Sequence, residues 1–202
     1  MKLVDLTMPL NKRTPVFPGN PKPSFKRVAY VDKDGYNAHR ICTNTHFGTH
    51  IDSPWHMLGD GKRLTDFSIE RFIGQAILFD VRGQREIDIE LKDVKENDIV
   101  IFRTDHTKKA YTSGFFEKTP VISRKLAEEL VERRVNIVGI DSFTLDEPPC
   151  DIHKLFFRHE ILILENLVEL GNIPVRICKI YVFPIKYDRI DGAPCRVIAQ
   201  IE

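Results

Sequence analysis

Histidine and aspartate side chains gather in one short segment of this sequence, HFGTHIDSPWH. Three of the chain's seven histidines, His46, His50 and His56, lie in it, and Asp52 lies between the last two. In an extended chain, alternate side chains point to the same side, and these four residues all occupy alternate positions. We therefore expect the three imidazoles and the carboxylate to converge on one face of an extended segment.

The types of these side chains indicate a metal site. Imidazole and carboxylate ligands together suit Zn²⁺, Mn²⁺ or Fe²⁺ better than Ca²⁺ or Mg²⁺. A catalytic site holds about three protein ligands and keeps a position open for water, so this segment supplies enough ligands and leaves one histidine free. Gly48 falls on the same face, where we expect it to leave room for an ion or a substrate. The alternative is a solvated strand on which polar side chains cluster by chance.

Short apolar or alternating runs indicate strands along the rest of the chain. The expected strands cover residues 26–31, 76–81, 99–103, 137–140, 161–164, 177–183 and 196–201. Segment 123–134 predicts a helix, because its first serine can cap it and its apolar side chains form one stripe. Two more helices are expected, one at 66–74 and one from Asp151 onward that turns Leu155 and Phe156 inward. Together these elements predict an α/β fold with a mixed, strongly curved sheet.

Composition and the placement of proline and glycine predict one domain over residues 1–202. Proline and glycine concentrate at 14–23, 146–151 and 189–195, each of which we expect to be an ordered loop rather than a linker. The 30 Lys and Arg against 29 Asp and Glu give a net charge of +1. This balance offers no electrostatic basis for binding nucleic acid or an anionic membrane, so neither is expected as a partner.

Several features predict a cytoplasmic location. The opening of the chain lacks the apolar stretch of a secretory signal, and the sequence has no apolar run of about 18 residues that would span a membrane. Its four cysteines form no CxxC pair and are expected to stay reduced. These are Cys42, Cys150, Cys178 and Cys195.

The histidine-rich segment resembles a known family signature. HFGTHIDSPWH is similar to the HxGTHxDxPxH motif of the metal-dependent cyclase family, whose best-known members are bacterial kynurenine formamidases, and every fixed letter is present. The resemblance covers the whole chain: DLTMPLNKRTPVFPGNPKP is similar to the family's opening segment, NDIVIFRTD and IVGIDSFTLD to its central strands, and PIKYDRIDGAPCRVIAQIE to its closing stretch. It implies a single domain with a mixed, barrel-like sheet flanked by helices, often called a swivelling β/β/α fold.

A second segment also matches the family. In HKLFFRHEILILENL, His153 precedes Glu165 by the twelve residues that separate the corresponding histidine and glutamate in the family. Where many members have two adjacent histidines, this chain has His153 followed by Lys154. A lysine there can repel a second cation or point outward, so the resemblance leaves open whether one or two ions bind.

The resemblance implies roles for these side chains. His46, His50 and Asp52 bind one divalent ion, with zinc favoured and manganese or iron as alternatives. In members that hold two ions, Asp52 bridges to a second ion held by the later histidine and glutamate, while His56 transfers protons. The histidines that match no ligand position are expected to be surface or structural residues: His39, His106 and His159.

The activity implied by the resemblance is hydrolysis of N-formylkynurenine to kynurenine and formate, a step of tryptophan catabolism. Trp55, Phe17 and Phe47 can wall a pocket for a planar aromatic amide, with burial in the core as the equal alternative. Two other functions stay open. One is hydrolysis of a cyclic amide, imide or lactone, as in the related isatin hydrolases, and the other is metal or ligand binding without turnover. The resemblance also implies a homodimer or larger homo-oligomer, with segment 14–23 as the expected contact.

Overall fold

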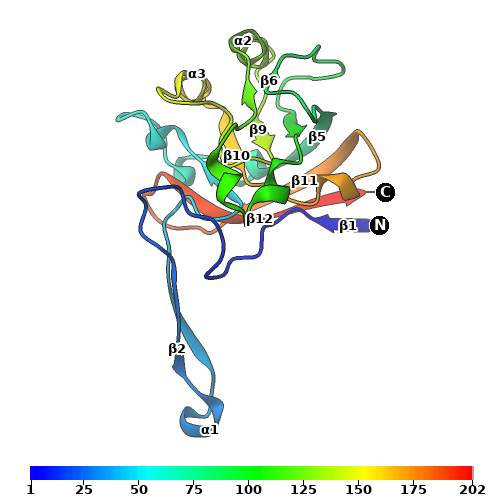
Figure 1. The fold of residues 1–202 in the computed structure, drawn as a ribbon. Coiled ribbons are helices and arrows are strands. Elements are labelled where there is room, and N and C mark those ends of the chain that lie inside the picture. Colours follow the sequence, from blue (N-terminus) through cyan, green and yellow to red (C-terminus); the bar gives the residue numbers. More distant parts are fainter. Residues whose placement is uncertain (202) are drawn as a thin grey trace.

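The computed structural model describes residues 1–201 and is built around one large mixed sheet (Figure 1). Its strands follow the order β1-β12-β11-β5-β7-β9-β10-β4, and β4 also pairs with β12, which closes the sheet into a ring. The central strands β5, β7, β9 and β10 are parallel, and the other pairings are antiparallel. The expected α/β fold with a mixed, barrel-like sheet is confirmed.

The strands of this sheet match most of the predicted runs. They are β1 (Lys2–Asp5), β4 (His50–Asp52), β5 (Ile73–Asp80), β7 (Ile99–Arg103), β9 (Ile137–Ile140), β10 (Leu162–Glu165), β11 (Ile177–Pro184) and β12 (Gly192–Ile201). A small separate sheet pairs β6 (Glu86–Ile87) with β8 (Val121–Ile122). The loop expected at 189–195 is wrong in its second half, because Gly192 already pairs with β4 and begins β12.

Two apolar layers form on the two faces of the sheet. Side chains such as Ile51, Leu162 and Leu164 fill the inside of the ring. Ile163 and Phe156 belong to the second layer, between the outer face and the helices α2 (Arg124–Glu132) and α3 (Asp151–Arg158). Along β10, therefore, alternate residues enter different layers, and this alternation decides which face carries polar side chains at the strand end.

The helix predictions hold for two of three segments. Ser123 caps α2 by accepting a hydrogen bond from the backbone N–H of Leu126, and α3 begins at Asp151 as expected. The helix expected at 66–74 is wrong, because its apolar residues are divided between two short 3₁₀ turns and the first residues of β5, where Gly74 pairs with Ile180 of β11. The 3₁₀ helices are Pro54–His56, Leu64–Asp66, Ile69–Phe72, His106–Lys109, Ser113–Phe116 and Leu170–Asn172.

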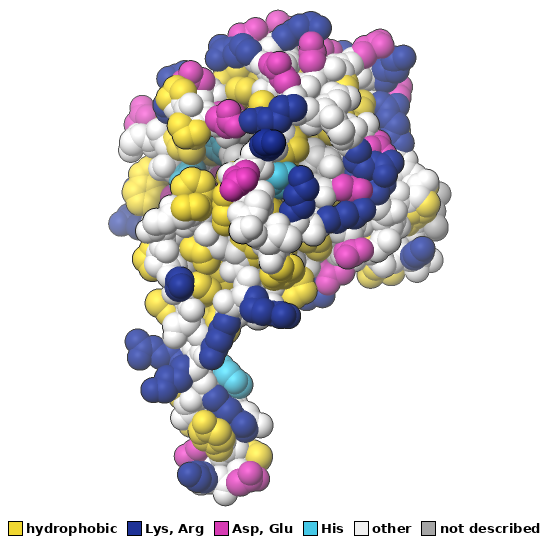
Figure 2. All heavy atoms as spheres, viewed as in Figure 1, with side chains coloured by type: hydrophobic (Ala, Val, Ile, Leu, Met, Phe, Trp, Pro, Cys, Tyr) yellow, Lys and Arg dark blue, Asp and Glu magenta, His cyan; other side chains and the backbone are white. Residues whose placement is uncertain are grey.

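A two-stranded arm projects from the body of the molecule (Figure 1). It pairs β2 (Ser24–Ala29) with β3 (Ala38–Cys42), and the short helix α1 (Val31–Asp34) forms its tip. The strand expected at 26–31 therefore exists, but it lies outside the main sheet and ends two residues early. Basic and hydrophobic side chains are exposed along the arm (Figure 2). Within residues 1–201 no helix has the length and hydropathy needed to cross a membrane.

Candidate functional site

Strand β4 places two of the predicted residues on the outer face of the sheet. Ile51 points into the ring, so His50 and Asp52 on either side of it point outward. The antiparallel register pairs His50 with Glu165 at the end of β10. Because Glu165 follows Ile163 by two residues, its side chain also lies on the outer face. Pairing of β4 with β10 thus brings together residues that are more than a hundred positions apart in the sequence.

The expected extended conformation of the whole motif is wrong, although its side chains do converge. Only the central three residues form a strand; Gly48 has a left-handed φ of 64° and His56 lies in a 3₁₀ turn. The ring centroids of His46 and His50 are nonetheless 5.1 Å apart, and those of His46 and His56 are 4.0 Å apart. The loops on either side of β4 fold back, so the histidines meet although they do not lie at alternate positions of a single strand.

Gly48 has a structural role in addition to the expected one. A Cβ atom at this position would lie 2.2 Å from Cδ2 of Leu10. Together with its left-handed φ, this contact explains the glycine by backbone conformation and close packing. Gly48 also lines the cavity that His46 and His50 line, in agreement with the room expected close to the backbone at this position.

His50 has the geometry of a ligand with a fixed tautomer. Its Nδ1 donates to the carbonyl oxygen of Gly48 at 2.8 Å, which leaves the Nε2 lone pair facing the carboxylates. Nε2 lies 3.3 Å from Oδ1 of Asp52 and 3.5 Å from Oε2 of Glu165. Burial is the largest influence on this imidazole and lowers its pKa to about 4, so His50 is neutral and able to bind a cation.

Helix α3 delivers His153 to the same place. The imidazole is buried, and its Nε2 lies 3.3 Å from Oε1 of Glu165. Its Nδ1 is paired with the carboxylate of Asp146, which also accepts the backbone N–H groups of Ile152 and His153 at the start of α3. Burial alone would lower the pKa of His153, but the hydrogen bond with Asp146 and the nearby carboxylate of Glu165 outweigh it and raise the pKa to about 10. Lys154 points away, with Nζ donating to the carbonyl oxygen of Pro149.

Two carboxylates at the centre of the cluster fit a divalent ion. Oε1 of Glu165 is buried and has no hydrogen-bond partner within residues 1–201, and burial raises the pKa of this carboxyl to about 7. Asp52 is equally buried, yet the adjacent His46 and His50 hold its pKa below the usual range. Potential ligand atoms lie within 4.8 Å of one another in two sets, one formed by His46, Asp52 and His56 and the other by His50, Asp52 and Glu165. Asp52 belongs to both sets, and their imidazole and carboxylate donors suit Zn²⁺, Mn²⁺ or Fe²⁺.

Sequence reasoning missed two carboxylates of the site. Asp146 holds His153, and Asp191 lies 2.8 Å from Nε2 of His46 and 3.3 Å from Nδ1 of His56 through the same oxygen. Asp146 begins one segment rich in proline and Asp191 lies inside another that contains glycine and proline; both segments indicated turns and drew no attention to the acids. Burial lowers the pKa of His46, but Asp52 and Asp191 outweigh it and raise the pKa to about 10.

A cavity of about 760 Å³ opens onto this cluster. It is lined by His46, His50, Asp52, His56, His153 and Glu165, so all six predicted ligand and proton-transfer residues reach it. Aromatic rings form another part of its wall: Phe17, Phe115, Phe116 and Phe143. Their ring centroids lie 4.9 to 6.1 Å apart in successive pairs, so they form one contiguous apolar surface.

The three aromatic residues expected to bind substrate are placed differently from one another. Phe17 lines the cavity. Phe47 is 1% exposed and packs in the interior, with its ring 6.3 Å from that of Phe25, and Trp55 stacks under the guanidinium of Arg63 at 4.4 Å. Neither Phe47 nor Trp55 lines the cavity, and of the two only Phe47 is buried in the core.

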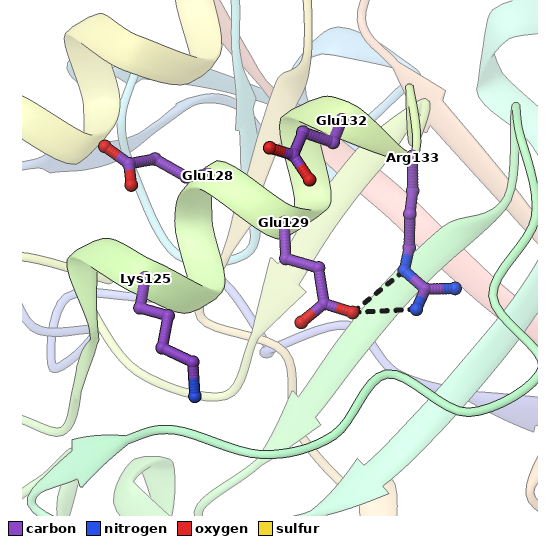
Figure 3. A pocket seen from close by; sticks show the side chains of 5 residues that line it. All are labelled: Lys125, Glu128, Glu129, Glu132 and Arg133. Carbon is purple, nitrogen blue, oxygen red and sulfur yellow. Dashed lines mark hydrogen bonds and ion pairs between the residues drawn. The ribbon is translucent and has the colours of Figure 1, made fainter.

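The remaining histidines and a second surface hollow offer no comparable chemistry. His39 lies on the arm, His159 ends α3, and His106 is buried with Nε2 2.7 Å from the carbonyl oxygen of Phe115. The second hollow lies along the exposed side of α2 (Figure 3). Its lining consists of charged side chains, among which Glu129 and Arg133 pair one helical turn apart, as expected of a solvated helix face.

Comparisons with known proteins agree with this geometry. A family model described as "Putative cyclase" matches residues 4–147. The kynurenine formamidase of Bacillus cereus is 28% identical, and the alignment covers 98% of this chain and 96% of that enzyme. A solved structure described as a potential metal-dependent hydrolase with cyclase activity is 28% identical with a TM-score of 0.84, covering 98% of this chain and 96% of the other. An isatin hydrolase bound to the product analogue thioisatinate shares the fold, with a TM-score of 0.88 at 22% identity, covering 98% and 91%.

Proposed function

Because the chain belongs to the cyclase family, we propose that it is a metal-dependent amidohydrolase that cleaves the C–N bond of an aromatic amide, with N-formylkynurenine as its favoured substrate. The observation that carries this proposal is the buried imidazole and carboxylate cluster at one wall of a cavity whose other wall is aromatic. The reaction yields kynurenine and formate and belongs to tryptophan catabolism.

The side chains proposed to hold the ions are those that the family resemblance assigns, and all of them line the cavity. His46, His50 and Asp52 would hold one ion, and Asp52 with His153 and Glu165 would hold a second. The unpartnered Oε1 of Glu165 supports this, since a buried carboxylate oxygen without a donor is costly. When bound, the ion supplies a Lewis acid that lowers the pKa of water and polarises the amide carbonyl. Zinc is proposed, because such sites bind it more tightly than manganese or iron.

His56 is proposed to move the proton. Water adds its oxygen to the formyl carbon, and the amide nitrogen departs as a neutral amine only if it gains a proton. His56 lines the cavity, and its Nδ1 faces Asp191, so its Nε2 is the atom available to accept the proton of the water and pass it to the nitrogen. The C–O bond forms, the C–N bond breaks, and the imidazole returns to its starting state.

The aromatic wall is proposed to position the ring of the substrate. Offset or edge-to-face contacts with Phe17, Phe116 and Phe143 would hold a planar ring and exclude water around the scissile bond. A fused cyclic amide is flat and aromatic as well, and the likeness to the isatin hydrolase fold makes such a compound the second candidate substrate.

Residues 1–202 are proposed to act as one cyclase-type domain in a homodimer. The antiparallel pairing of β1 with β12 joins the two ends of the chain in one sheet, which supports a single domain. The four cysteines are free, which supports a reducing compartment such as the cytoplasm.

The first experiment is hydrolysis of N-formylkynurenine by purified protein that has been stripped of metal and then supplied with Zn²⁺ or Mn²⁺. We expect turnover that depends on the added metal, with kcat/KM of about 10⁴ M⁻¹s⁻¹ or more. Isatin serves as the second substrate in the same assay. Metal binding without turnover of either compound would contradict the proposed activity and favour the non-catalytic alternative.

A further inference from the structure

Asp191 occupies a position in the site that its neighbours fix from both sides. The pairing of β12 with β4 sets Gly192 opposite Asp52, so Asp191 lies beside the end of the histidine motif. Its carbonyl oxygen accepts two hydrogen bonds from Ser53, one from the backbone N–H at 2.9 Å and one from the hydroxyl at 2.8 Å. The backbone of Asp191 is therefore held by the residue that directly follows β4, the strand that carries two of the proposed ligands.

The next residue allows the carboxylate to approach two imidazoles at once. A Cβ atom on Gly192 would lie 2.8 Å from Cε1 of His46, so the His46 ring rests directly against the backbone there. Through one oxygen, Asp191 then lies 2.8 Å from Nε2 of His46 and 3.3 Å from Nδ1 of His56. The side chain is 31% exposed, so one side of this carboxylate faces solvent and the other faces the two rings.

These contacts assign one nitrogen of each ring to Asp191. Nε2 of His46 pairs with Asp191, and Nδ1 pairs with Oδ1 of Asp52 at 2.7 Å, so Nδ1 is the nitrogen that would give up its proton to bind an ion while the bond to Asp191 is kept. When Nδ1 of His56 donates to the same carboxylate, its Nε2 keeps the lone pair. A carboxylate that accepts the second N–H of a histidine sets the tautomer and orientation of the ring, both for metal ligands and for proton carriers.

We propose that Asp191 is a positioning residue shared by His46 and His56: one carboxylate turns the first ring toward the metal position and the second toward the substrate. The His56 half of this inference rests on the proposed hydrolase activity, whereas the His46 half concerns metal affinity alone. Because Asp191 orients both His46 and His56, a shift of its carboxylate would disturb metal binding and proton transfer together.

The test replaces Asp191 by Asn, a side chain of nearly the same shape that carries no charge and whose single amide oxygen accepts an N–H more weakly than a carboxylate does. Asp188→Asn is the matched control, because Asp188 lies in the same loop and, within residues 1–201, forms no hydrogen bond or ion pair with either histidine. We expect D191N to weaken Zn²⁺ binding, measured by chelator competition, by about 10–100-fold. At saturating metal we expect kcat to fall by about 100-fold with KM changed by less than about threefold, as expected for a lost proton-transfer alignment. D188N should match the wild type in both measurements.

Two further measurements separate positioning from damage to the fold. Thermal unfolding of metal-free D191N should stay close to that of the wild type, and ¹⁵N NMR of the imidazoles should show a changed tautomer at His56. In a double variant with His56→Ala, adding D191N should cause little further loss of kcat, because both changes remove the same function.

The outcomes distinguish this inference from the proposed function. Unchanged Zn²⁺ affinity in D191N would overturn the His46 half. Unchanged kcat in D191N, in an assay where H56A loses activity, would overturn the His56 half while the proposed function stands. If the wild-type protein hydrolyses no amide, the proposed function fails, and the metal affinity and the His56 tautomer still decide the role of Asp191.

Discussion

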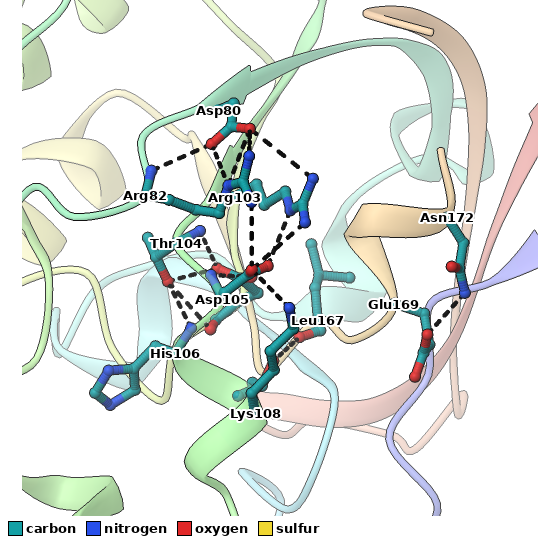
Figure 4. Close-up of polar contacts among 12 residues, drawn as sticks. Asp80, Arg82, Arg103, Thr104, Asp105, His106, Lys108, Leu167, Glu169 and Asn172 are labelled. Atoms are coloured by element: carbon teal, nitrogen blue, oxygen red, sulfur yellow. Dashed lines mark hydrogen bonds and ion pairs between the residues drawn. The ribbon is translucent and has the colours of Figure 1, made fainter. Parts of the chain in front are cut away.

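Each of the parallel strands β5, β7, β9 and β10 has a carboxylate at its carboxyl end or just beyond it. The partners of these carboxylates differ between β5 and β7 at one end of this sheet edge and β10 at the other. Around the ends of β5 and β7, Asp105 lies 2.9 Å from Nε of Arg103 and 2.7 Å from Nζ of Lys108, and Asp80 pairs with Arg82 at 2.7 Å (Figure 4). At the end of β10, Glu165 faces two imidazoles and the carboxylate of Asp52, and its Oε1 has no hydrogen-bond partner within residues 1–201.

The end of β9 shows how a buried acid is satisfied without a cation. Asp141 accepts the backbone N–H of Thr104 at 2.6 Å, the hydroxyl of Thr104 at 2.6 Å and the N–H of Asp105 at 2.8 Å. The same sheet edge thus carries one buried acid with a full set of donors, Asp141, and another with an unpartnered oxygen, Glu165. The donors around Asp141 hold its loop in place, whereas Glu165, beside the neutral imidazole of His50, is suited to a metal.

Removal of Glu165 should weaken metal binding strongly, whereas replacement of Asp141 should hardly change it. Glu165→Ala should weaken Zn²⁺ binding by at least about 100-fold and abolish measurable hydrolysis, because a direct ligand is lost. Asp141→Asn should leave the affinity within about twofold, because its donors belong to the protein. Chelator competition on both purified variants measures this. Equal loss of Zn²⁺ affinity in the two variants would contradict the distinction between Glu165 as a metal ligand and Asp141 as a carboxylate satisfied by the protein.

Around Glu165, the loss of a proposed metal ligand and the loss of the proposed proton carrier should have different effects on metal content and kcat. His56→Ala should lower kcat by about 10²–10⁴-fold, the range of general acid–base catalysis, and leave metal content unchanged. Metal analysis of the purified variant together with steady-state kinetics checks this. Loss of bound metal in H56A would make His56 a ligand, as its membership in one of the two donor sets allows.

The aromatic wall offers a smaller effect on substrate binding. Phe17→Ala should raise KM for an aryl formamide by about 10-fold with little change in kcat, because a stacking contact made equally in ground and transition states is lost. Trp55→Leu is the control, since Trp55 packs under Arg63 outside the cavity. Steady-state kinetics of the two variants should differ in KM; the same KM in both would argue against a binding role for Phe17.

Sequence patterns predicted the buried parts of the fold well. Strands β7 and β9 begin and end at the predicted residues because both are almost wholly buried, and their apolar runs stop where burial stops. The helix expected at 66–74 failed because its spacing of apolar residues also fits two 3₁₀ turns followed by a strand whose pairing with β11 is set by distant residues.

The candidate site was predictable to the extent that its residue types and spacing carry the chemistry. The imidazoles of the motif and the pair His153 and Glu165 do meet at one cavity. Asp191 could not be predicted, because it reaches His46 through the register of β12 against β4, across 145 positions of sequence. Such contacts depend on which strands pair, and a local sequence pattern does not show the pairing.

The smallest effect expected is the pH dependence that Asp141 adds to stability. Burial raises the pKa of this carboxyl from 3.8 to about 6, against the hydrogen bonds from Thr104 and Asp105. Between these two pKa values the folded protein binds more protons than the unfolded chain, so the free energy of unfolding falls as pH rises through this window.

The side chain of Asn in the Asp141→Asn variant cannot ionise, so the variant lacks this contribution. The free energy of unfolding of D141N relative to wild type should therefore increase by about 1–3 kcal/mol from pH 4 to pH 6. Urea unfolding of the metal-free proteins at several pH values measures it, and parallel curves would show that the donors around Asp141 stabilise its charge fully. In that case the protein's own donors would stabilise the charge of Asp141, whereas the charge of Glu165 would still require a metal ion.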